Sequence, residues 1–434
     1  MRLSRYMKIW QAPEDDDRLL LYSTKRGASI LVSRNLLASV NDGTISQANM
    51  DTLVSFGFLV PDGEEEKNEL LDAFIELNRL NTRFSAQVVL NLDCNLACSY
   101  CYEGGMKGRN YMSPETASLL AALAEAGYVA HGKGIEFSFY GGEPLMSMDL
   151  IVYLSQRLRK SAAAKGTEYS FDMVTNGTLL NAAMVEKLLP LGFTGAKVTL
   201  DGPRENHDRF RPFVSGKGSF DLIIANVKEV CDLTEIQVGG NYTRENYREF
   251  PRLLDFFLEE GLTPERLSLV RFDPVSKSGG DFALPEFNEG CASLDEPWLM
   301  EASLFLREEI LKRGFNTPRM RPAACMIESC NDLVVNWDGS LFKCPAMLGW
   351  KEMAIGDLES GISDYTESHN MGVWKKEECL DCAYLPLCFG GCRYLKLLRD
   401  GRIDDVDCRK AFLDETLETF VRQDLKYQPK RSLK

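Results

Sequence analysis

The sequence predicts an α/β protein in which a partial barrel of parallel strands lies between a small N-terminal unit and a cysteine-rich C-terminal region. Three observations predict this. Six short β-rich runs alternate with helical stretches from residue 86 to 319, strand-like runs and a helix precede them, and 8 of the 13 cysteines lie between Cys325 and Cys408. An even distribution over 434 residues would place about 2.5 cysteines there. We therefore expect four parts, at residues 1–62, 63–85, 86–319 and 320–434.

The first part, residues 1–62, combines short strands with a helix. "LLLYSTKRGASILVS" predicts two strands around a Lys-Arg-Gly turn, and "SQANMDTLVSFGFLV" predicts a helix ending at Gly57 and then a short strand. This order favours a winged-helix-like module, and the alternative is a plain α+β cap on the following domain. The acidic stretch "DGEEEKNELLDAFIELNRL" then predicts a solvated linker helix within residues 63–85.

Strand-like and helical runs alternate through residues 86–319. The strand-like runs are "AQVVLNL", "IEFSFY", "SFDMVT", "GAKVTL", "EIQVGGN" and "RLSLVRF". Helical stretches such as "SPETASLLAALAEAGYVA" separate them, and Ser113 is the expected N-cap of that helix. Six such units predict a parallel sheet curled into a partial barrel, whose active site would lie at the carboxyl ends of the strands.

Composition narrows the class of protein. A net charge of −14 argues against a partner such as nucleic acid or an anionic membrane. The N-terminus shows no signal peptide, and no run of about 18 apolar residues could cross a bilayer. We therefore expect a cytoplasmic protein, in a compartment where disulfides are rare. Clustered cysteines in such a compartment predict metal binding.

The first cysteine cluster, "LDCNLACSYCYEGG", places Cys94, Cys98 and Cys101 directly after the first barrel strand. Thiolates suit zinc or iron–sulfur clusters. Zinc sites usually have four ligands, and the three histidines of the chain, His131, His207 and His369, lie elsewhere. Three thiolates on a cubane cluster leave one iron open to another ligand. A structural zinc site and simple buried thiols are the alternatives.

The spacing C-x-x-x-C-x-x-C after a barrel strand resembles the radical S-adenosylmethionine (SAM) superfamily. This resemblance implies a partial (β/α)6 TIM-like barrel, a 4Fe–4S cluster on the three cysteines, and SAM as the source of a 5′-deoxyadenosyl radical. It also implies cofactor-binding residues at successive strand ends, each of which could otherwise be ordinary turn or cap chemistry. They are Gly141, Gly142 and Glu143 near the methionyl amino group, Asn176, Thr199 and Arg211 near the ribose and carboxylate, and Tyr100, the aromatic residue of the cysteine motif.

The C-terminal region, 320–434, contains eight cysteines whose spacing resembles the SPASM extension of radical SAM enzymes. That resemblance implies two auxiliary 4Fe–4S clusters, three in all. The first would be bound by Cys325, Cys330, Cys344 and Cys392, and the second by Cys379, Cys382, Cys388 and Cys408. Two zinc ribbons are the alternative. Cys231 and Cys291 fall outside all three sets and are expected to be ordinary thiols.

SPASM-bearing enzymes usually modify peptides or proteins, and several peptide maturases bind the leader of their precursor through an N-terminal winged-helix element. The sequence is similar to maturases of the geopeptide type. The resemblance implies a thioether or carbon–carbon crosslink in a ribosomally made precursor peptide, with a flavodoxin or ferredoxin as electron donor. The leader would add a strand to the N-terminal unit. The sequence names no general base.

Two other functions stay open. Anaerobic sulfatase-maturating (formylglycine-forming) enzymes share the three-cluster pattern, but they carry an acid directly after the third auxiliary cysteine. Here Pro345 and Ala346 follow Cys344. A non-catalytic iron–sulfur electron carrier is the second alternative, and it would leave the polar strand ends without a role.

Overall fold

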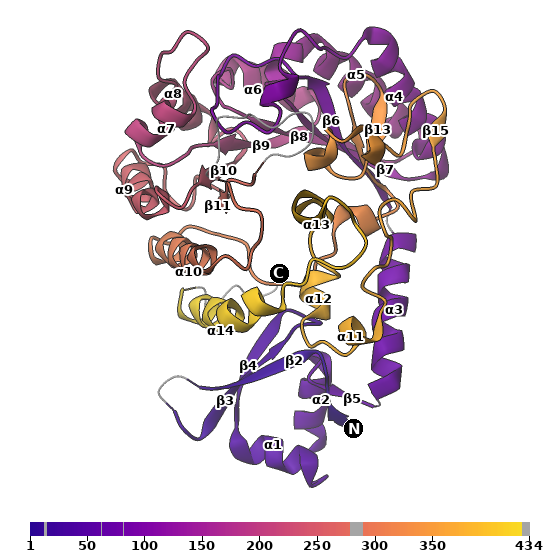
Figure 1. Ribbon diagram of the computed structural model, residues 1–434, viewed down its shortest axis with the longest axis vertical. Coiled ribbons are helices and arrows are strands. Elements are labelled where there is room, and N and C mark those ends of the chain that lie inside the picture. Colours follow the sequence, from indigo (N-terminus) through magenta and orange to yellow (C-terminus); the bar gives the residue numbers. More distant parts are fainter. Residues whose placement is uncertain (13–14, 62, 81, 278–289, 428–434) are drawn as a thin grey trace.

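The computed structural model describes residues 1–12, 15–61, 63–80, 82–277 and 290–427. Its centre is a ten-stranded sheet in the order β11-β10-β9-β8-β7-β6-β12-β13-β14-β15 (Figure 1). Six of these strands are parallel and follow the chain order: β6 (Arg83–Asn91), β7 (Gly134–Gly141), β8 (Tyr169–Thr175), β9 (Phe193–Thr199), β10 (Glu235–Tyr242) and β11 (Leu269–Pro274). All six predicted strands are present. The α/β class is confirmed, and the mostly parallel sheet is consistent with the expected partial barrel.

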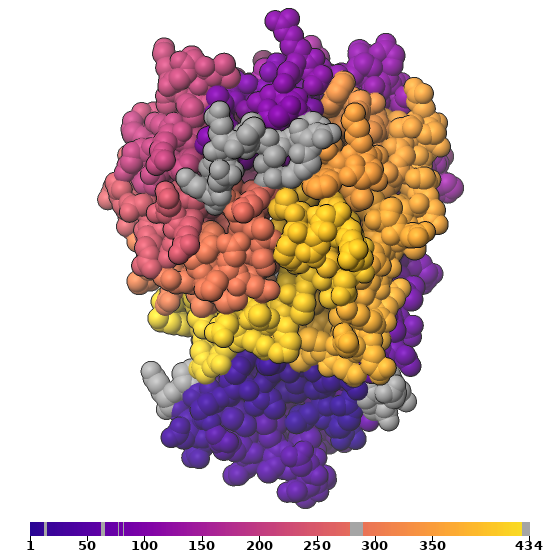
Figure 2. Space-filling view, viewed as in Figure 1, coloured from indigo at the N-terminus to yellow at the C-terminus, as the bar shows by residue number. Residues whose placement is uncertain are grey.

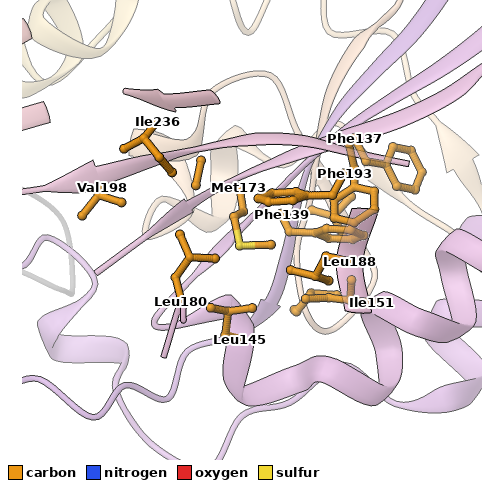
Figure 3. Close-up of a cluster of buried hydrophobic side chains, with 14 of the residues drawn as sticks. Phe137, Phe139, Leu145, Ile151, Met173, Leu180, Leu188, Phe193, Val198 and Ile236 are labelled. Atoms are coloured by element: carbon orange, nitrogen blue, oxygen red, sulfur yellow. The ribbon is translucent and has the colours of Figure 1, made fainter. Parts of the chain in front are cut away.

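Helices cover the parallel strands and bury a common core. Buried and half-buried residues alternate along β7 and β8, so Phe137, Phe139, Phe171 and Met173 point into one layer. Figure 3 shows Phe137, Phe139 and Met173 packing near Ile151 and Leu188 of the covering helices. The expected helix after Ser113 begins there, because the Ser113 hydroxyl accepts from the Thr116 N–H at 3.0 Å. The helices of this region are α4 (Pro114–Gly127), α5 (Met148–Ala164), α6 (Ala182–Leu188), α7 (Arg204–Phe210), α8 (Phe220–Val230), α9 (Phe250–Glu259) and α10 (Pro297–Lys312).

The cysteine-rich region continues the same sheet. Its strand β12 (Asp332–Val335) pairs in parallel with β6, and β13 (Ser340–Phe342), β14 (Gly356–Asp357) and β15 (Gly361–Ile362) follow in antiparallel order. The rest of this region forms α11 (Glu377–Leu380), α12 (Leu385–Cys388), α13 (Arg393–Asp400) and α14 (Lys410–Tyr427). The C-terminal cysteines are therefore attached directly to the strand that carries the first cysteine cluster.

The N-terminal unit contains the predicted strands and helix. It consists of β1 (Arg2–Leu3), β2 (Met7–Gln11), β3 (Arg18–Ser23), β4 (Ala28–Ser33), α1 (Arg34–Asn41), α2 (Gln47–Ser55) and β5 (Leu59–Val60). Strands β2, β3 and β4 form an antiparallel sheet, and β1 pairs with β5. Leu20 and Tyr22 of β3 pack against Leu387, Leu413 and Leu417 of the C-terminal region. In the space-filling view this unit lies directly against that region (Figure 2).

Helix α3 (Gly63–Arg79) forms where a linker helix was expected, but the expectation that it is solvated was wrong. Glu66 and Leu70 are buried, and Phe74 packs edge-on against Trp374 with ring centroids 5.1 Å apart. One apolar face of α3 thus packs on the C-terminal region, and Figure 1 shows the helix running from the N-terminal unit towards the barrel. In the described residues, no helix is both long and apolar enough to cross a membrane.

Candidate active site

The carboxyl ends of the parallel strands surround one cavity of about 480 Å³. Of the residues predicted to bind the cofactor, six line this cavity and one does not. The six are Tyr100, Gly141, Gly142, Asn176, Thr199 and Arg211. Cys94, Cys98 and Cys101 line it as well. Glu143 lies behind the wall, where it is fully buried.

The three cysteines are half-buried on the loop after β6. Burial raises the pKa of both Cys94 and Cys101, and the nearby Cys98 thiol acts in the same direction on each. All three side chains line the same cavity. The Cys94 Sγ accepts from the Leu96 N–H at 3.4 Å and lies 3.7 Å from the Asn176 amide nitrogen. In the described part of the chain, no three His, Cys, Asp or Glu side chains converge on a position suited to a single metal ion.

Gly141 and Gly142 bring the ends of β6 and β7 together. Gly141 has φ +127°, and a Cβ there would lie 2.1 Å from the Asn91 carbonyl oxygen. A Cβ on Gly142 would lie 2.1 Å from the Asp93 carbonyl oxygen. A side chain at either position would therefore collide with backbone. These glycines therefore allow the end of β7 to lie close to the loop that carries the cysteines, as well as to any ligand in the cavity.

Glu143 fixes the end of the neighbouring strand β8. Its carboxylate accepts from the Thr175 hydroxyl at 2.8 Å, the Asn176 N–H at 2.9 Å and the Leu145 N–H at 3.1 Å. Burial raises the pKa of Glu143, and these hydrogen bonds act in the opposite direction. The geometry gives Glu143 a positioning role, and its predicted contact with a ligand ammonium stays a prediction.

Tyr100 and Arg211 belong to a buried network in the wall of the cavity. The Tyr100 hydroxyl is hydrogen-bonded to the Asp201 carboxylate, and Arg211 Nη1 donates to the Tyr100 oxygen at 2.7 Å. Asp201 is fully buried and also accepts from the Asn241 N–H at 2.7 Å. Burial raises the pKa of Asp201, and the guanidinium of Arg211 counteracts that shift. The network holds the Arg211 guanidinium at the cavity wall.

Asp201 and Asn241 were not among the predicted cofactor-binding residues. Both were nevertheless visible in the sequence as polar residues at strand ends, in "TLDG" and "EIQVGGN". Asn241 lines the cavity and Asp201 lies behind it. Nothing in the sequence indicated the pairing of these two residues, which are 40 positions apart.

Three buried polar atoms on cavity-lining residues lack a hydrogen-bond partner among the described residues. They are Gln87 Oε1, Glu103 Oε1 and Arg211 Nε. Burial raises the pKa of Glu103 to about 7. Buried polar atoms in proteins are normally paired, so this wall matches a polar ligand with its own donors and acceptors. The donor set of three thiols and this polar wall therefore suit an iron–sulfur cluster and a polar cofactor side by side.

The C-terminal cysteines gather in two groups. Burial, and to a lesser extent Cys392 and Cys325, raise the pKa of the half-buried Cys344 thiol to about 12. Burial likewise raises the pKa of Cys388 to about 11, with Cys382 and Cys379 contributing, and Cys408 contributes in the same way to Cys379. Cys325, Cys344 and Cys392 are thus near one another, as are Cys379, Cys382, Cys388 and Cys408. The division of the eight cysteines into two ligand sets stays a prediction. Cys231 and Cys291 are buried outside both.

Residues 88–257 match the family described as the Radical SAM superfamily. The matched segment contains the three cysteines of the first cluster and strands β7 to β10. The chain therefore contains a radical SAM domain, and enzymes with this domain use SAM and a 4Fe–4S cluster.

Individual relatives cover most of the chain. The cysteine-type anaerobic sulfatase-maturating enzyme of Clostridium novyi is 23% identical, over 77% of this chain and 96% of its own length. The PqqA peptide cyclase of Granulibacter bethesdensis is 24% identical, over 72% of this chain and 83% of its own length.

Two solved structures show the same fold. The structure of polyhistidine-tagged anSMEcpe with bound AdoMet has a TM-score of 0.62 at 19% identity, covering 78% of this chain and 98% of that chain. The structure of Streptococcus suis SuiB bound to S-adenosylmethionine has a TM-score of 0.54 at 16% identity, covering 94% of this chain and 98% of that chain.

Proposed function

We propose that this enzyme installs a thioether or carbon–carbon crosslink in a ribosomally synthesised precursor peptide. The extent of the fold similarity carries the proposal. A match to SuiB over 94% of the chain must include most of residues 1–62, whereas the match to anSMEcpe covers 78%. SuiB has been solved bound to its precursor peptide SuiA. The PqqA peptide cyclase, a relative in sequence, is named for a peptide substrate as well.

The cavity residues would hold both cofactors. Cys94, Cys98 and Cys101 would bind a 4Fe–4S cluster through three thiolates, and SAM would lie against the six cavity residues named above. Together these groups, when bound, supply a 5′-deoxyadenosyl radical that removes a hydrogen atom from the substrate.

The chain itself contributes binding and orientation. Arg211 is held by Tyr100, so its guanidinium faces the cavity in a fixed position suited to a carboxylate. Glu143 orients Asn176, whose side-chain amide nitrogen already donates to Asn95 at 2.8 Å beside Cys94. The buried walls exclude water, which protects a reactive intermediate from side reactions.

The C-terminal region would be a SPASM domain with two auxiliary 4Fe–4S clusters. The two spatial groups of cysteines support the assignment of Cys325, Cys330, Cys344 and Cys392 to the first cluster, and of Cys379, Cys382, Cys388 and Cys408 to the second. Crosslinking removes two hydrogens from the peptide, so a second electron must leave the substrate, and an auxiliary cluster is its proposed acceptor. A flavodoxin or ferredoxin would supply reducing electrons in the cytoplasm.

The N-terminal unit would bind the leader peptide as a winged-helix-like element. Its sheet has two edge strands, β2 and β4. Arg422 of α14 donates to the Gln11 carbonyl at 2.7 Å, which covers one end of β2. Strand β4 is therefore the edge we assign to the leader, with backbone hydrogen bonds giving affinity. Leu31, 38% exposed on β4, would contact a leader side chain.

Sulfatase maturation is the second candidate, favoured by the 96% coverage of the Clostridium novyi enzyme. One observation argues against this candidate. Ala346 lines the cavity near the position at which a sulfatase-maturating enzyme is expected to carry an acid. The anSMEcpe enzyme has also been solved with bound peptides, so substrate identity must be decided by experiment.

The test is an intact mass. The enzyme would be co-expressed anaerobically with the small open reading frame nearest its gene, with Cys98→Ala as the matched inactive control. A loss of two hydrogens per crosslink that is absent from the control supports the proposal, and tandem fragmentation then locates the bond. An unchanged precursor, together with oxidation of a sulfatase-derived cysteine peptide by the same enzyme, would establish the second candidate instead.

A further inference from the structure

Lys343 lies directly before Cys344 and is fully buried. It follows strand β13, and its Nζ donates to the backbone carbonyls of Ser329 and Asp332. Those two carbonyls lie on either side of Cys330 in the chain. One ammonium therefore ties the loop carrying Cys330 to the segment carrying Cys344.

Among the described residues, no carboxylate forms an ion pair with the Lys343 ammonium. Its hydrogen bonds go to carbonyl oxygens, and in the part of the chain that the structure describes it forms no ion pair. The ring of Tyr365 lies 5.5 Å from Nζ. The Asp332 carboxylate and the Cys330 and Cys325 thiols lie close enough to interact electrostatically with this ammonium without forming an ion pair. A buried ammonium is costly unless an anion accompanies it.

Arg393 provides a contrast beside the same cysteines. It is also fully buried, directly after Cys392, but its guanidinium pairs with the buried Glu328 carboxylate. It also donates to the Phe389 and Gly391 carbonyls at 3.1 and 3.2 Å. The charge of Arg393 is thus neutralised by an ion pair, whereas Lys343 forms no ion pair in the described part of the chain.

We propose that Lys343 is the buried counter-cation of the first auxiliary cluster, raising its reduction potential and positioning Cys330. The inference rests on the proposed assignment of Cys325, Cys330, Cys344 and Cys392 to that cluster. A cubane cluster on four thiolates is an anion, and reduction makes it more negative. A nearby fixed positive charge stabilises the reduced form more than the oxidised form. Such a cluster is a better electron acceptor.

The test compares Lys343→Met with Lys396→Met in the full-length, cluster-loaded enzyme. Lys396 is a matched control, because it follows Cys392 on α13 but pairs with Asp400 at 2.5 Å and Asp404 at 3.5 Å. Iron and sulfide are measured first, and each cluster is then titrated anaerobically with detection by electron paramagnetic resonance. In Lys343→Met we expect at least a tenfold lower ratio of reduced to oxidised form for one cluster at fixed potential, about 59 mV for one electron.

The other clusters, and all clusters of Lys396→Met, should titrate as in the wild type. An unchanged titration of every cluster in Lys343→Met, with full iron content, would refute the proposal. If Lys343→Met loses iron, the Lys343→Arg variant is measured as well. Iron retained in Lys343→Arg would support the need for a positive charge at this position. Equal iron loss in both variants would show that Lys343 acts only through its shape and would refute the proposal. Wild-type iron no greater than one cluster requires would instead disprove the auxiliary-cluster assignment. Peptide modification plays no part in these readouts, so its failure would leave them interpretable.

Discussion

The backbone N–H of Asp201 donates to Nδ1 of His207 at 3.2 Å, and Nε2 of the same ring lies 3.0 Å from the Ser219 hydroxyl. The Ser219 hydroxyl itself donates to the Arg211 carbonyl at 2.7 Å. Since the Ser219 hydroxyl proton is used in that bond, the Ser219 oxygen must accept a proton from Nε2 of His207. Nδ1 accepts from the Asp201 N–H and must therefore be unprotonated. The geometry therefore requires a neutral His207 behind the Asp201–Arg211 network.

The neutral state of His207 predicts a pH dependence of stability. Burial lowers the pKa of His207 well below its ordinary value, so the unfolded chain takes up a proton below about pH 6.5 while the folded chain resists it. The contribution of His207 to the free energy of unfolding is then fully present above about pH 6.5. It decreases as the pH falls, by about 2 kcal/mol between pH 7 and 5. Thermal unfolding of the wild type and His207→Gln between pH 5 and 8 tests this. Parallel profiles of the two proteins would contradict it.

Replacement of Glu143 should weaken SAM binding. In Glu143→Gln an amide group replaces one oxygen that accepts from Thr175 or Asn176, and loss of one such charge-assisted hydrogen bond costs about 1.5–3 kcal/mol. If Asn176 shifts accordingly, SAM affinity should fall roughly tenfold or more at unchanged iron content. Glu136→Gln is the matched control, because Glu136 lies on β7, the strand that precedes Glu143, but its side chain is 46% exposed. Equal binding by both variants, measured by anaerobic equilibrium dialysis, would show that Glu143 does not position the site.

Cysteine variants should separate the clusters. Cys98→Ala should lose about a third of the iron and reduce SAM cleavage to background, because Cys98 is one of the three proposed ligands of the radical cluster and lines the cavity. Cys344→Ala should lose a similar share of iron yet retain SAM cleavage. Cys231→Ala, a buried thiol outside all sets, should keep all iron. Iron loss in Cys231→Ala, or abolished cleavage in Cys344→Ala, would contradict the assignment.

Leader binding should depend on strand β4. Leu31→Asp places a charge beside the proposed docking edge, so affinity for the precursor peptide should fall by about tenfold or more. Ile9→Asp is the control: Ile9 is 41% exposed on β2, the edge that Arg422 partly covers. Fluorescence anisotropy with a labelled precursor measures both. A greater loss of affinity in Ile9→Asp than in Leu31→Asp would indicate that the leader binds at β2 instead.

Expectations based on local sequence agreed with the structure wherever a single segment carried them. The turn of Lys25, Arg26 and Gly27, the Ser113 cap and all six parallel strands depend on short-range periodicity and cap chemistry, which a few residues specify. The expectation for α3 was wrong for a different reason. Its acidic composition concealed an apolar face, and burial of Glu66 is possible because Arg2, Ser4 and Arg5 converge on its carboxylate. None of those partners is near in sequence.

By itself, the sequence determined the spacing of Cys94, Cys98 and Cys101 and the strand ends that carry polar residues, because the spacing of residues within one loop is a property of the chain. Only the tertiary structure decided that Glu143 orients Asn176, that Asn241 joins Tyr100 and Asp201, and that Lys343 is buried without a carboxylate partner among the described residues. Burial and pairing depend on which distant segments meet. The parallel order of the strands brings their ends together, and the addition of β12 to β6 attaches the C-terminal cysteines to the sheet that carries the first cluster.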